Sequence, residues 1–497
     1  KLFAPKDDFM KDMGVPSFKE AVRNITYTKA TQIYGENLPQ YINDRLNKEL
    51  DSIIGNNYAS IYYISHLLVK KSKEAGYVVG SRGSVGSSIV AFFMGITEVN
   101  GLVPHYYCKK CHFTAFKFNE EQKAKYGVSK EASQFDQVLQ SVGTGYDLPD
   151  AKCPICGEEL EKDGVDIPFE TFLGFNGDKV PDIDLNFSGE YQSTAHEFCR
   201  ELFGVDNAFR AGTISTIAEK TAYGYVKCYL ETKGIQLRNC EINRITSKIT
   251  GVKRSTGQHP GGIVVVPKDI EYTEITPVQY PADDLTSTWR TTHYDYHKFE
   301  DNLLKMDILG HEDPTMIRFL MNFVEAHPEE FPFKTVEEIP LSDKKVLSIF
   351  SGVSSLGVDK TQVLQSVGTT GIPEFGTQLS KEMLMEINPQ TVDDLIKISG
   401  LSHGTDVWNG NARDYMLGKK PGVPPIPFKD LIGCRDDIMV YLIQKGLKAS
   451  DAFEIMERVR KGKGLTPEQE KKMLEHDVPK WYIDSCKLIK YMFPKAH

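Results

Sequence analysis

The sequence lacks the features of a membrane-bound or secreted protein. Its best apolar run, Ile89 to Gly95, is far shorter than the roughly 18 residues that a membrane-spanning helix needs. It has no signal-peptide pattern and opens at Lys1 without a Met, which indicates a piece cut from a longer protein. We therefore expect no membrane partner.

An overall positive charge is also missing. The formal net charge is -9, which argues against a protein that binds nucleic acid over its whole surface, although local patches decide recognition. Basic residues do cluster at 70–73, 253–254 and 458–463. Each cluster is compatible with a nucleic-acid contact and equally with a solvated helix face.

The cysteines do not form a disulfide framework, because nine is an odd number and the chain of 497 residues is long. The length itself predicts about three or four domains. Four cysteines occur as two Cys-x-x-Cys pairs separated by 41 residues: Cys108, Cys111, Cys153 and Cys156. Two such pairs can close a tetrahedral four-thiolate zinc site with no open position. We expect this zinc to be structural and to stabilise the polar insertion at 116–145.

Two carboxylates, Asp182 and Asp184, lie one residue apart in the apolar run 180–187. On a strand they would point to the same face, while Ile183 and Leu185 would point into the core. Two close anions repel unless a cation lies between them, and hard oxygen ligands suit magnesium. The alternative is a surface strand end with two solvated acids, which is common for short motifs.

A glycine- and serine-rich segment, 76–88, precedes the apolar run from Ile89. A short strand, a turn and a helix start would gather backbone N–H groups and hydroxyls at the positive end of a helix, where a phosphate can bind. Arg82 adds a bidentate charge. The segment is neither a Walker loop nor a Rossmann fingerprint. Paired with the Asp-x-Asp strand, it is typical of nucleotidyltransferases.

A third acid, Asp307, lies in the apolar, strand-like run 303–310. Burying a carboxylate without a partner costs free energy, so we expect a cation or another partner beside Asp307. Three such acids could hold two metal ions, one lowering the pKa of an attacking hydroxyl and one binding the triphosphate and the leaving pyrophosphate.

Helical spacing predicts helices at 43–54, 59–73, 195–203 and 213–230. On the last of these, Lys220 could face a nucleic-acid backbone or solvent. The glycine-rich stretch 251–262, which contains Arg254 and His259, runs into an apolar strand. Its glycines would let the backbone approach a ligand closely, or they would simply form a turn before the strand.

Taken together, these motifs resemble the catalytic core of bacterial C-family replicative DNA polymerases. The likeness comprises GSRGSVGS, the two Cys-x-x-Cys pairs, PDIDLNFSGEY, GQHPGG and KMDILG, in this order. It continues through GLSHGTDVW at 400–408, IGCRDD at 432–437 and RKGKG at 460–464. The four-cysteine site resembles the PolC type, the DNA polymerase III alpha subunit of low-GC Gram-positive bacteria.

The resemblance implies a multidomain α/β plus α fold with a polymerase beta-like nucleotidyltransferase palm. The first part of the palm would cover 1–190, with the zinc-bearing insertion at about 101–165, and the second part 258–312. A helical thumb at 191–257 would be inserted between them. Helical fingers would follow at 313–497, truncated at the C-terminus. The exonuclease, phosphoesterase-like, clamp-binding and duplex-binding modules of the family are not found.

The same resemblance implies template-directed DNA synthesis in the bacterial cytoplasm, with dNTPs and primer-template DNA as partners and two Mg²⁺ and one Zn²⁺ as cofactors. In the full-length protein a sliding clamp and replisome proteins would be partners too. Asp182, Asp184 and Asp307 would be the catalytic, magnesium-binding acids. The residues expected to bind the nucleotide or its phosphates are Gly80, Ser81, Arg82, Gly83, Ser84, Gly86, Ser87, His403, Arg435, Arg460, Lys461 and Lys463. Those expected to bind DNA are Lys220, Lys253 and Arg254.

Two alternatives stay open. One is another magnesium-dependent nucleotidyltransferase, or an Asp-x-Asp glycosyltransferase, that acts on a small acceptor. The other is a non-catalytic fragment that binds nucleotide or DNA but whose truncated fingers cannot close. A preference for primed DNA with all four deoxynucleotides would exclude the first, and magnesium-dependent nucleotide binding without incorporation would favour the second.

Overall fold

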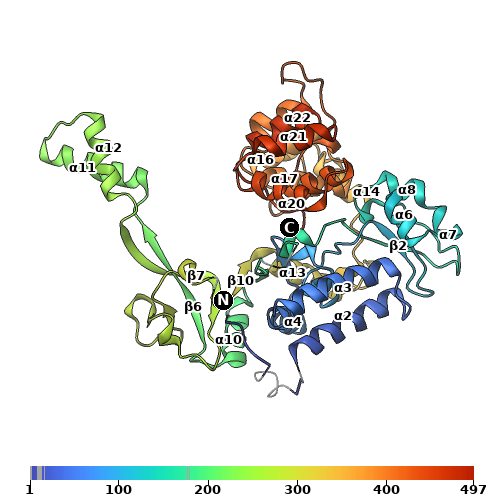
Figure 1. Ribbon diagram of the computed structural model, residues 1–497, viewed down its shortest axis with the longest axis horizontal. Coiled ribbons are helices and arrows are strands. Elements are labelled where there is room, and N and C mark those ends of the chain that lie inside the picture. The colour runs from blue at the N-terminus through green and yellow to red at the C-terminus, as the bar shows by residue number, and fades with distance from the viewer. Residues whose placement is uncertain (1–2, 8–13, 16, 176, 178, 301) are drawn as a thin grey trace. The chain divides into compact units, whose positions relative to one another are not determined.

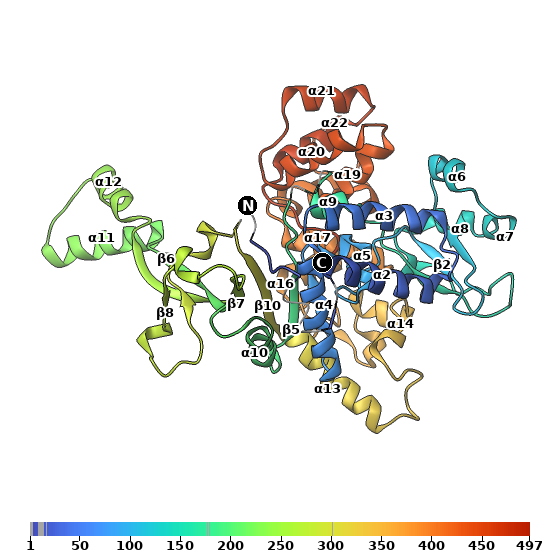
Figure 2. The same cartoon turned by 60° about the horizontal axis from the view of Figure 1, so that its bottom comes forward.

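The computed structural model describes residues 3–7, 14–15, 17–175, 177, 179–300 and 302–497 (Figures 1 and 2). The chain forms two compact units. The smaller unit comprises Lys1–Gly14 and Gly189–His311, and the larger unit comprises Val15–Ser188 and Glu312–His497. Among the described residues, no helix combines the length and the apolar character that crossing a membrane requires.

Three helices begin the larger unit: α2 (Phe18–Tyr34), α3 (Gln40–Gly55) and α4 (Ala59–Glu74). The Ser17 side chain caps α2 by accepting a hydrogen bond from the Glu20 backbone N–H. On α3 the fully buried apolar side chains recur at helical spacing, at Ile42, Leu46, Leu50 and Ile53. The helices predicted at 43–54 and 59–73 are confirmed.

A short strand, a turn and a helix follow. Strand β1 (Gly80–Arg82) leads through the 3₁₀ turn η1 (Val85–Ser87) into α5 (Ile89–Phe93). Strand β1 pairs antiparallel with β5 (Asp184–Ser188). The predicted order of strand, turn and helix is confirmed.

The cysteine-bearing insertion has its own small sheet and core. Strands β2 (His105–Tyr107), β3 (Thr114–Phe116) and β4 (Glu161–Asp163) form an antiparallel sheet in the order β3-β2-β4. Tyr106 and Leu139 are buried in its core, beside Cys108 and Cys153. The short helices here are α6 (Glu120–Tyr126), α7 (Lys130–Ser133), α8 (Asp136–Ser141) and η2 (Gly145–Asp147). The short helix α9 (Glu170–Leu173) follows the insertion.

The C-terminal part of the larger unit is helical, and its described residues pack around one apolar core that includes Ile398, Met439 and Ile455. Figure 2 shows α19 to α22 gathered together. The elements are α13 (Glu312–Ala326), η6 (Val336–Glu338), α14 (Lys344–Leu347), η7 (Ser348–Phe350), η8 (Ser354–Leu356), α15 (Lys360–Val363), α16 (Gln378–Ile387), α17 (Val392–His403), η9 (Trp408–Ala412), α18 (Arg413–Met416), η10 (Phe428–Asp430), α19 (Arg435–Gln444), α20 (Ala449–Arg460), α21 (Pro467–Glu475) and α22 (Lys480–Leu488).

The smaller unit contains a mixed sheet in the strand order β10-β7-β6-β9-β8. Its long strands are β6 (Ala208–Thr216), β7 (Lys253–Val265) and β10 (Leu304–His311). Strands β6 and β9 run parallel, and the other pairs within this group are antiparallel. The remaining elements are α10 (Gln192–Phe203), α11 (Glu219–Lys233), α12 (Asn239–Ile249), η3 (Tyr272–Glu274), β8 (Val278–Gln279), η4 (Pro281–Asp283), β9 (Thr291–Thr292) and η5 (Tyr296–Lys298).

Two predictions for the smaller unit need correction. The helix predicted from 213 begins only at Glu219, because Thr213 to Thr216 pair with β7 as the end of strand β6. For the glycine-rich stretch 251–262, the alternative of a turn before the strand is wrong, because most of it is the N-terminal half of strand β7, whose residues from Lys253 pair with β6. Figure 1 shows α11 and α12 at the far end of this β6–β7 ribbon. The helix predicted at 195–203 is confirmed as part of α10.

Candidate nucleotide and metal sites

The pairing of β1 with β5 brings the glycine-rich turn to the Asp-x-Asp motif. Arg82 and Asp184 are Cα partners in this ladder. A Cβ added at Gly83 would lie 3.6 Å from Asp184 Oδ2, so the turn lies against the carboxylate. Gly83 also has a φ of +71°, which a residue with a side chain rarely adopts.

The two acids are not on one strand as predicted. Strand β5 begins at Asp184, and Asp182 lies before it and is exposed. The alternation itself is confirmed, because Ile183, Leu185 and Phe187 are all buried.

The positive end of helix α5 is already occupied, contrary to the prediction that it is open to a phosphate. The buried Glu49 carboxylate accepts hydrogen bonds from the backbone N–H groups of Ile89 and Val90, both at 3.1 Å, and from Ser88 Oγ at 2.9 Å. An internal anion therefore takes the place that a ligand would need.

The residues of the turn divide into two sets. Gly80, Arg82, Gly83 and Ser84 are partly exposed, whereas Ser81, Gly86 and Ser87 are buried. The Ser81 N–H donates to Glu98, and Thr171 Oγ1 bonds to Ser87 Oγ at 3.0 Å. The partly exposed set forms the surface that a ligand could reach, and the buried set supports it from behind.

Basic side chains of the helical part gather near Asp182. Burial lowers the pKa of Lys179 to about 8, and the positive charges of Arg435 and Arg460 contribute to this shift. The negative charges of Glu457 and Asp182 oppose it. Burial raises the pKa of Glu457, but Arg460 and Lys461 outweigh it and hold that pKa at about 2.

Among the basic residues singled out from the sequence, Arg435 is buried and donates to the Thr171 backbone carbonyl at 3.0 Å. Lys461 and Lys463 are exposed just beyond the end of α20. Lys179 was missed by sequence reasoning; its position three residues before Asp182 was the available signal.

His403 ends α17 and faces Glu374. Its Nε2 lies 3.5 Å from Glu374 Oε2, and this hydrogen bond raises the pKa of His403. The charge of Arg82 lowers the same pKa, so the glycine-rich turn and the end of α17 lie within electrostatic reach of each other. His497 also contacts Glu374, through Nε2 at 3.1 Å from Oε1.

In the smaller unit, Asp307 is buried on β10 between Met306 and Ile308. Lys305 Nζ lies 2.8 Å from its Oδ2, while Oδ1 has no hydrogen-bond partner in the described part of the chain. A buried carboxylate oxygen without a hydrogen-bond partner is a suitable ligand for a cation.

The GQHPGG motif lies opposite Asp307, since Gly262 is its Cα partner on β7. The Gly262 N–H donates to His259 Nδ1 at 2.7 Å, so this ring nitrogen is an acceptor. Burial lowers the pKa of His259, although the charge of Asp307 opposes the shift. His259 is therefore a neutral neighbour of Asp307, with Nδ1 3.7 Å from Oδ1.

Lys220, Lys253 and Arg254 are all exposed. Lys220 lies in the first turn of α11, and the other two begin β7. Tyr225 and Tyr229 are 47% and 59% exposed on α11. Helical spacing placed Tyr225 on the apolar side of this helix, and Tyr229 was not singled out.

The four cysteines of the two pairs come together, with one Sγ from each within 4.8 Å of the others. The Sγ atoms of Cys108 and Cys156 lie 3.5 Å apart, and so do those of Cys111 and Cys153. Four thiolates at the usual zinc–sulfur length of about 2.3 Å would be separated by about 3.8 Å. The cluster is compatible with a zinc site. The acids Asp182, Asp184 and Asp307 offer the hard oxygen ligands that are compatible with magnesium.

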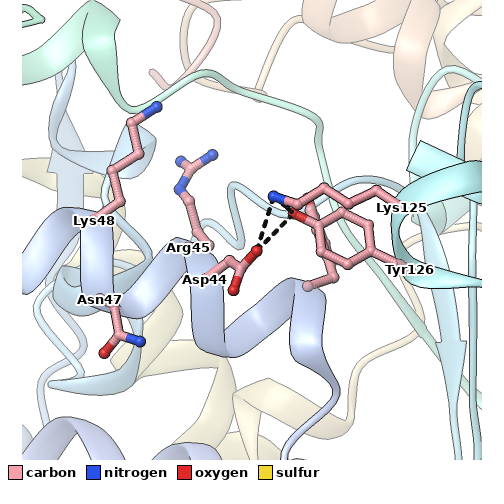
Figure 3. Close-up of a pocket in the computed structure, with 7 residues that line it drawn as sticks. Asp44, Arg45, Asn47, Lys48, Lys125 and Tyr126 are labelled. Atoms are coloured by element: carbon pink, nitrogen blue, oxygen red, sulfur yellow. Dashed lines mark hydrogen bonds and ion pairs between the residues drawn. The ribbon is translucent and has the colours of Figure 1, made fainter. Parts of the chain in front are cut away.

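A cavity of about 440 Å³ lies between α3 and α6 (Figure 3). It is lined by Tyr41, Asp44, Arg45, Asn47, Lys48, Lys125 and Tyr126. Its charges are largely paired within the chain: Lys125 with Asp44 at 2.9 Å, Arg45 with Glu49 at 2.6 Å, and Lys48 with Glu170. The cavity is therefore a gap between α3 and α6, and the cations that line it already pair with carboxylates of the chain.

The chain matches two family models of known proteins. The family model of the bacterial DNA polymerase III alpha NTPase domain matches residues 20–238 and 226–310, and that of the bacterial DNA polymerase III alpha subunit finger domain matches 313–480.

Three relatives are described as DNA polymerase III PolC-type. The chain is 55% identical over 494 residues to that of Oceanobacillus iheyensis, covering 99% of this chain and 32% of the relative. For Bacillus subtilis strain 168 the identity is 55% over 493 residues, with the same coverages. For Staphylococcus aureus strain N315 it is 56% over 478 residues, covering 96% of this chain and 31% of the relative. The chain thus spans about a third of the length of these relatives. It belongs to the bacterial DNA polymerase III alpha family and is similar over nearly its whole length to the PolC-type members.

Proposed function

We propose that this chain is the catalytic core of a PolC-type replicative DNA polymerase. It would transfer a deoxynucleotide from a dNTP to the 3'-hydroxyl of a primer, as directed by a DNA template. The observation that carries the proposal is the register of β1 and β5, which sets Arg82 opposite Asp184. A phosphate-binding charge and a metal-binding carboxylate at adjacent positions are what nucleotidyl transfer needs.

In this proposal Asp182, Asp184 and Asp307 bind two magnesium ions. When bound, the ions would supply a lowered pKa for the primer hydroxyl and charge neutralisation for the pyrophosphate. Asp307 supports this role because its Oδ1 is buried without a hydrogen-bond partner among the described residues. A magnesium ion would share the Asp307 carboxylate with Lys305, which pairs with Oδ2, while the neutral His259 adds no further positive charge.

The triphosphate would bind at the open surface of the glycine-rich turn, on Gly80, Arg82, Gly83 and Ser84. Ser81, Gly86 and Ser87 would hold the turn in shape, because they are buried and Ser81 and Ser87 bond internally. Lys179, just before Asp182, would add positive charge, as would Arg435, Arg460, Lys461 and Lys463 of the helical part. His403 would lie beside the nucleotide.

We propose that the DNA backbone contacts the exposed residues Lys220, Lys253 and Arg254. Tyr225 and Tyr229 on the exposed face of α11 would add aromatic contacts to the nucleic acid. The region 191–257 would then act as a thumb, 1–190 and 258–312 as the palm, and 313–497 as fingers.

The cysteine cluster would hold one structural zinc ion, because four thiolates leave no position for a substrate. In the full-length protein the partners would be a sliding clamp and other replisome proteins, in the bacterial cytoplasm.

The test is extension of a primed DNA template by one nucleotide in the presence of Mg²⁺, comparing the parent chain with D184N and with D51N. Asp51 is exposed on α3 and serves as a matched control. We expect extension by the parent and D51N and none by D184N. Magnesium-dependent dNTP binding that is lost in D184N, without extension by any chain, would favour the non-catalytic alternative. Neither extension nor dNTP binding by the parent would overturn the proposal.

A further inference from the structure

The larger unit contains a second cluster of metal-ligating side chains, formed by Glu374, His403 and His497. One ligand atom from each lies within 4.8 Å of the others. The carboxylate bridges the two rings, with Oε2 3.5 Å from His403 Nε2 and Oε1 3.1 Å from His497 Nε2. Each ring nitrogen meets a different carboxylate oxygen, so the three groups converge from three directions on one small region.

The His403 ring is oriented as a metal ligand requires. Its Nδ1 lies 2.8 Å from the Ser399 backbone carbonyl, which can only accept, so Nδ1 carries the proton. In the neutral form of the ring, Nε2 then carries the lone pair, which is directed toward the side where Glu374 lies. Histidine ligands usually donate their other ring N–H to a carbonyl or carboxylate in this way, which fixes the tautomer before the metal binds.

Phe493 holds the two rings in place. The His403 ring stacks on Phe493 with centroids 4.6 Å apart, and the His497 ring meets the same phenyl ring edge-on, also at 4.6 Å. The His497 side chain is only 8% exposed. An aromatic side chain that fixes both imidazoles lowers the entropy lost when they close on an ion.

We propose that Glu374, His403 and His497 form a zinc-binding site distinct from the four-cysteine cluster. Two imidazoles and one carboxylate are the ligand set of open zinc sites, in which a fourth position takes water or an anion. The Glu374 and His403 side chains are 37% and 24% exposed, so that position reaches solvent. Imidazole nitrogens favour zinc over magnesium, which prefers oxygen ligands alone.

The competing interpretation is a simple ion pair, in which a protonated His403 neutralises Glu374. The hydrogen bonds from His403 and His497 hold the pKa of Glu374 well below its usual range. The nearby positive charge of Arg82 disfavours a cation at His403, so zinc affinity would be lower than at the four thiolates. The ion pair and the zinc site differ in one measurable quantity, the number of zinc ions bound per chain.

The test measures zinc by mass spectrometry after dialysis of the whole chain against buffered zinc. Millimolar Mg²⁺ is kept present to saturate the proposed magnesium-binding carboxylates. We expect two zinc ions per chain for the parent and one for each of E374Q, H403Q and H497Q. The matched control is H476Q, since His476 is partly exposed on the same helical part, away from the three ligands, and should leave both ions bound. Circular dichroism checks that each variant folds.

Cobalt substitution provides a second measurement, made on the parent chain. Co²⁺ at the cysteines gives strong thiolate charge-transfer absorption, whereas Co²⁺ at nitrogen and oxygen ligands gives only weak visible bands. We expect both absorption signals, which should appear one after the other as the two sites fill with Co²⁺. One zinc ion per parent chain, or two retained by all three variants, would overturn the proposal. Neither measurement uses DNA or nucleotide, so the result is independent of the proposed polymerase activity.

Discussion

Arg82 lies directly opposite Asp184 in the antiparallel ladder of β1 and β5. Opposed residues of such a ladder project to the same face, with their Cβ atoms about 5 Å apart. The guanidinium proposed to bind phosphate and the carboxylate proposed to bind magnesium are thus carried by one hydrogen-bonded pair of strands. A rigid pair of strands keeps such groups in register better than a loop would.

Replacing Arg82 tests its role in triphosphate binding. We expect R82A to lower kcat/KM for the dNTP roughly 10- to 100-fold, because a charged hydrogen bond contributes about 1.5–3 kcal/mol. R82K should recover part of this loss, since lysine keeps the charge but not the bidentate geometry. Steady-state extension kinetics measure both, with R23A as a control at an exposed site on α2. An unchanged KM and kcat in R82A would exclude the assigned role.

The buried Glu49 carboxylate should stabilise the base of the glycine-rich turn. E49Q removes the negative charge that pairs with Arg45. The same carboxylate accepts hydrogen bonds from the Ile89 and Val90 N–H groups. We expect the local opening free energy to fall by about 3 kcal/mol, since breaking a buried pair leaves an uncompensated charge. Hydrogen exchange of the Ile89 and Val90 amides measures this, with E74Q as an exposed control. Equal protection in both variants would contradict the expectation.

The cysteine cluster gives a prediction about zinc removal. C111S should reduce zinc binding and expose the small core around Tyr106 and Leu139, because metal binding and folding of such a site are coupled. We expect amide protection between 105 and 163 to drop by at least about 2 kcal/mol. A chelator should do the same to the parent chain. C228S is the matched control, since Cys228 is exposed on α11. Full protection in C111S would argue against a structural metal.

His105 gives a pH prediction. Burial lowers the pKa of His105 to about 4, and its Nδ1 and Nε2 bond to the Val103 carbonyl and to the Tyr34 hydroxyl. The folded pKa lies below the unfolded value of about 6.5, so the stability that the neutral ring contributes is present above pH 6.5 and is lost as pH falls through 4.

The difference in unfolding free energy between the parent and H105N should therefore shrink by up to about 3 kcal/mol between pH 6.5 and 4. Comparison with H105N isolates His105 from the buried Asp163, whose raised pKa of about 6 acts in the opposite direction. NMR of the imidazole should give a midpoint near 4, and a midpoint near 6.5 would contradict the burial argument.

Local patterns in the sequence were enough to predict several elements. The apolar spacing of α3 and α4 and the strand, turn and helix around Arg82 depend on residues near each other along the chain. The convergence of the four cysteines could be predicted because the two-residue spacing within each pair is specific for a thiolate metal site. The family could also be named from the motifs, because their order and spacing are specific. The roles assigned to Asp182, Asp184 and Asp307 stay predictions that primer extension will test.

Contacts between distant segments decided the rest. Glu49 closes the N-terminus of α5 from 40 positions away in the chain, and Glu374 meets His497 across 123 positions. The end of β6 looked helical by its apolar spacing, yet pairing with β7 made it a strand. Periodicity reports only which face of a segment is apolar. The partner that covers that face, and the charge that satisfies a helix end, are set by tertiary packing, since burial of a polar group is tolerated only where a distant residue supplies its hydrogen bond.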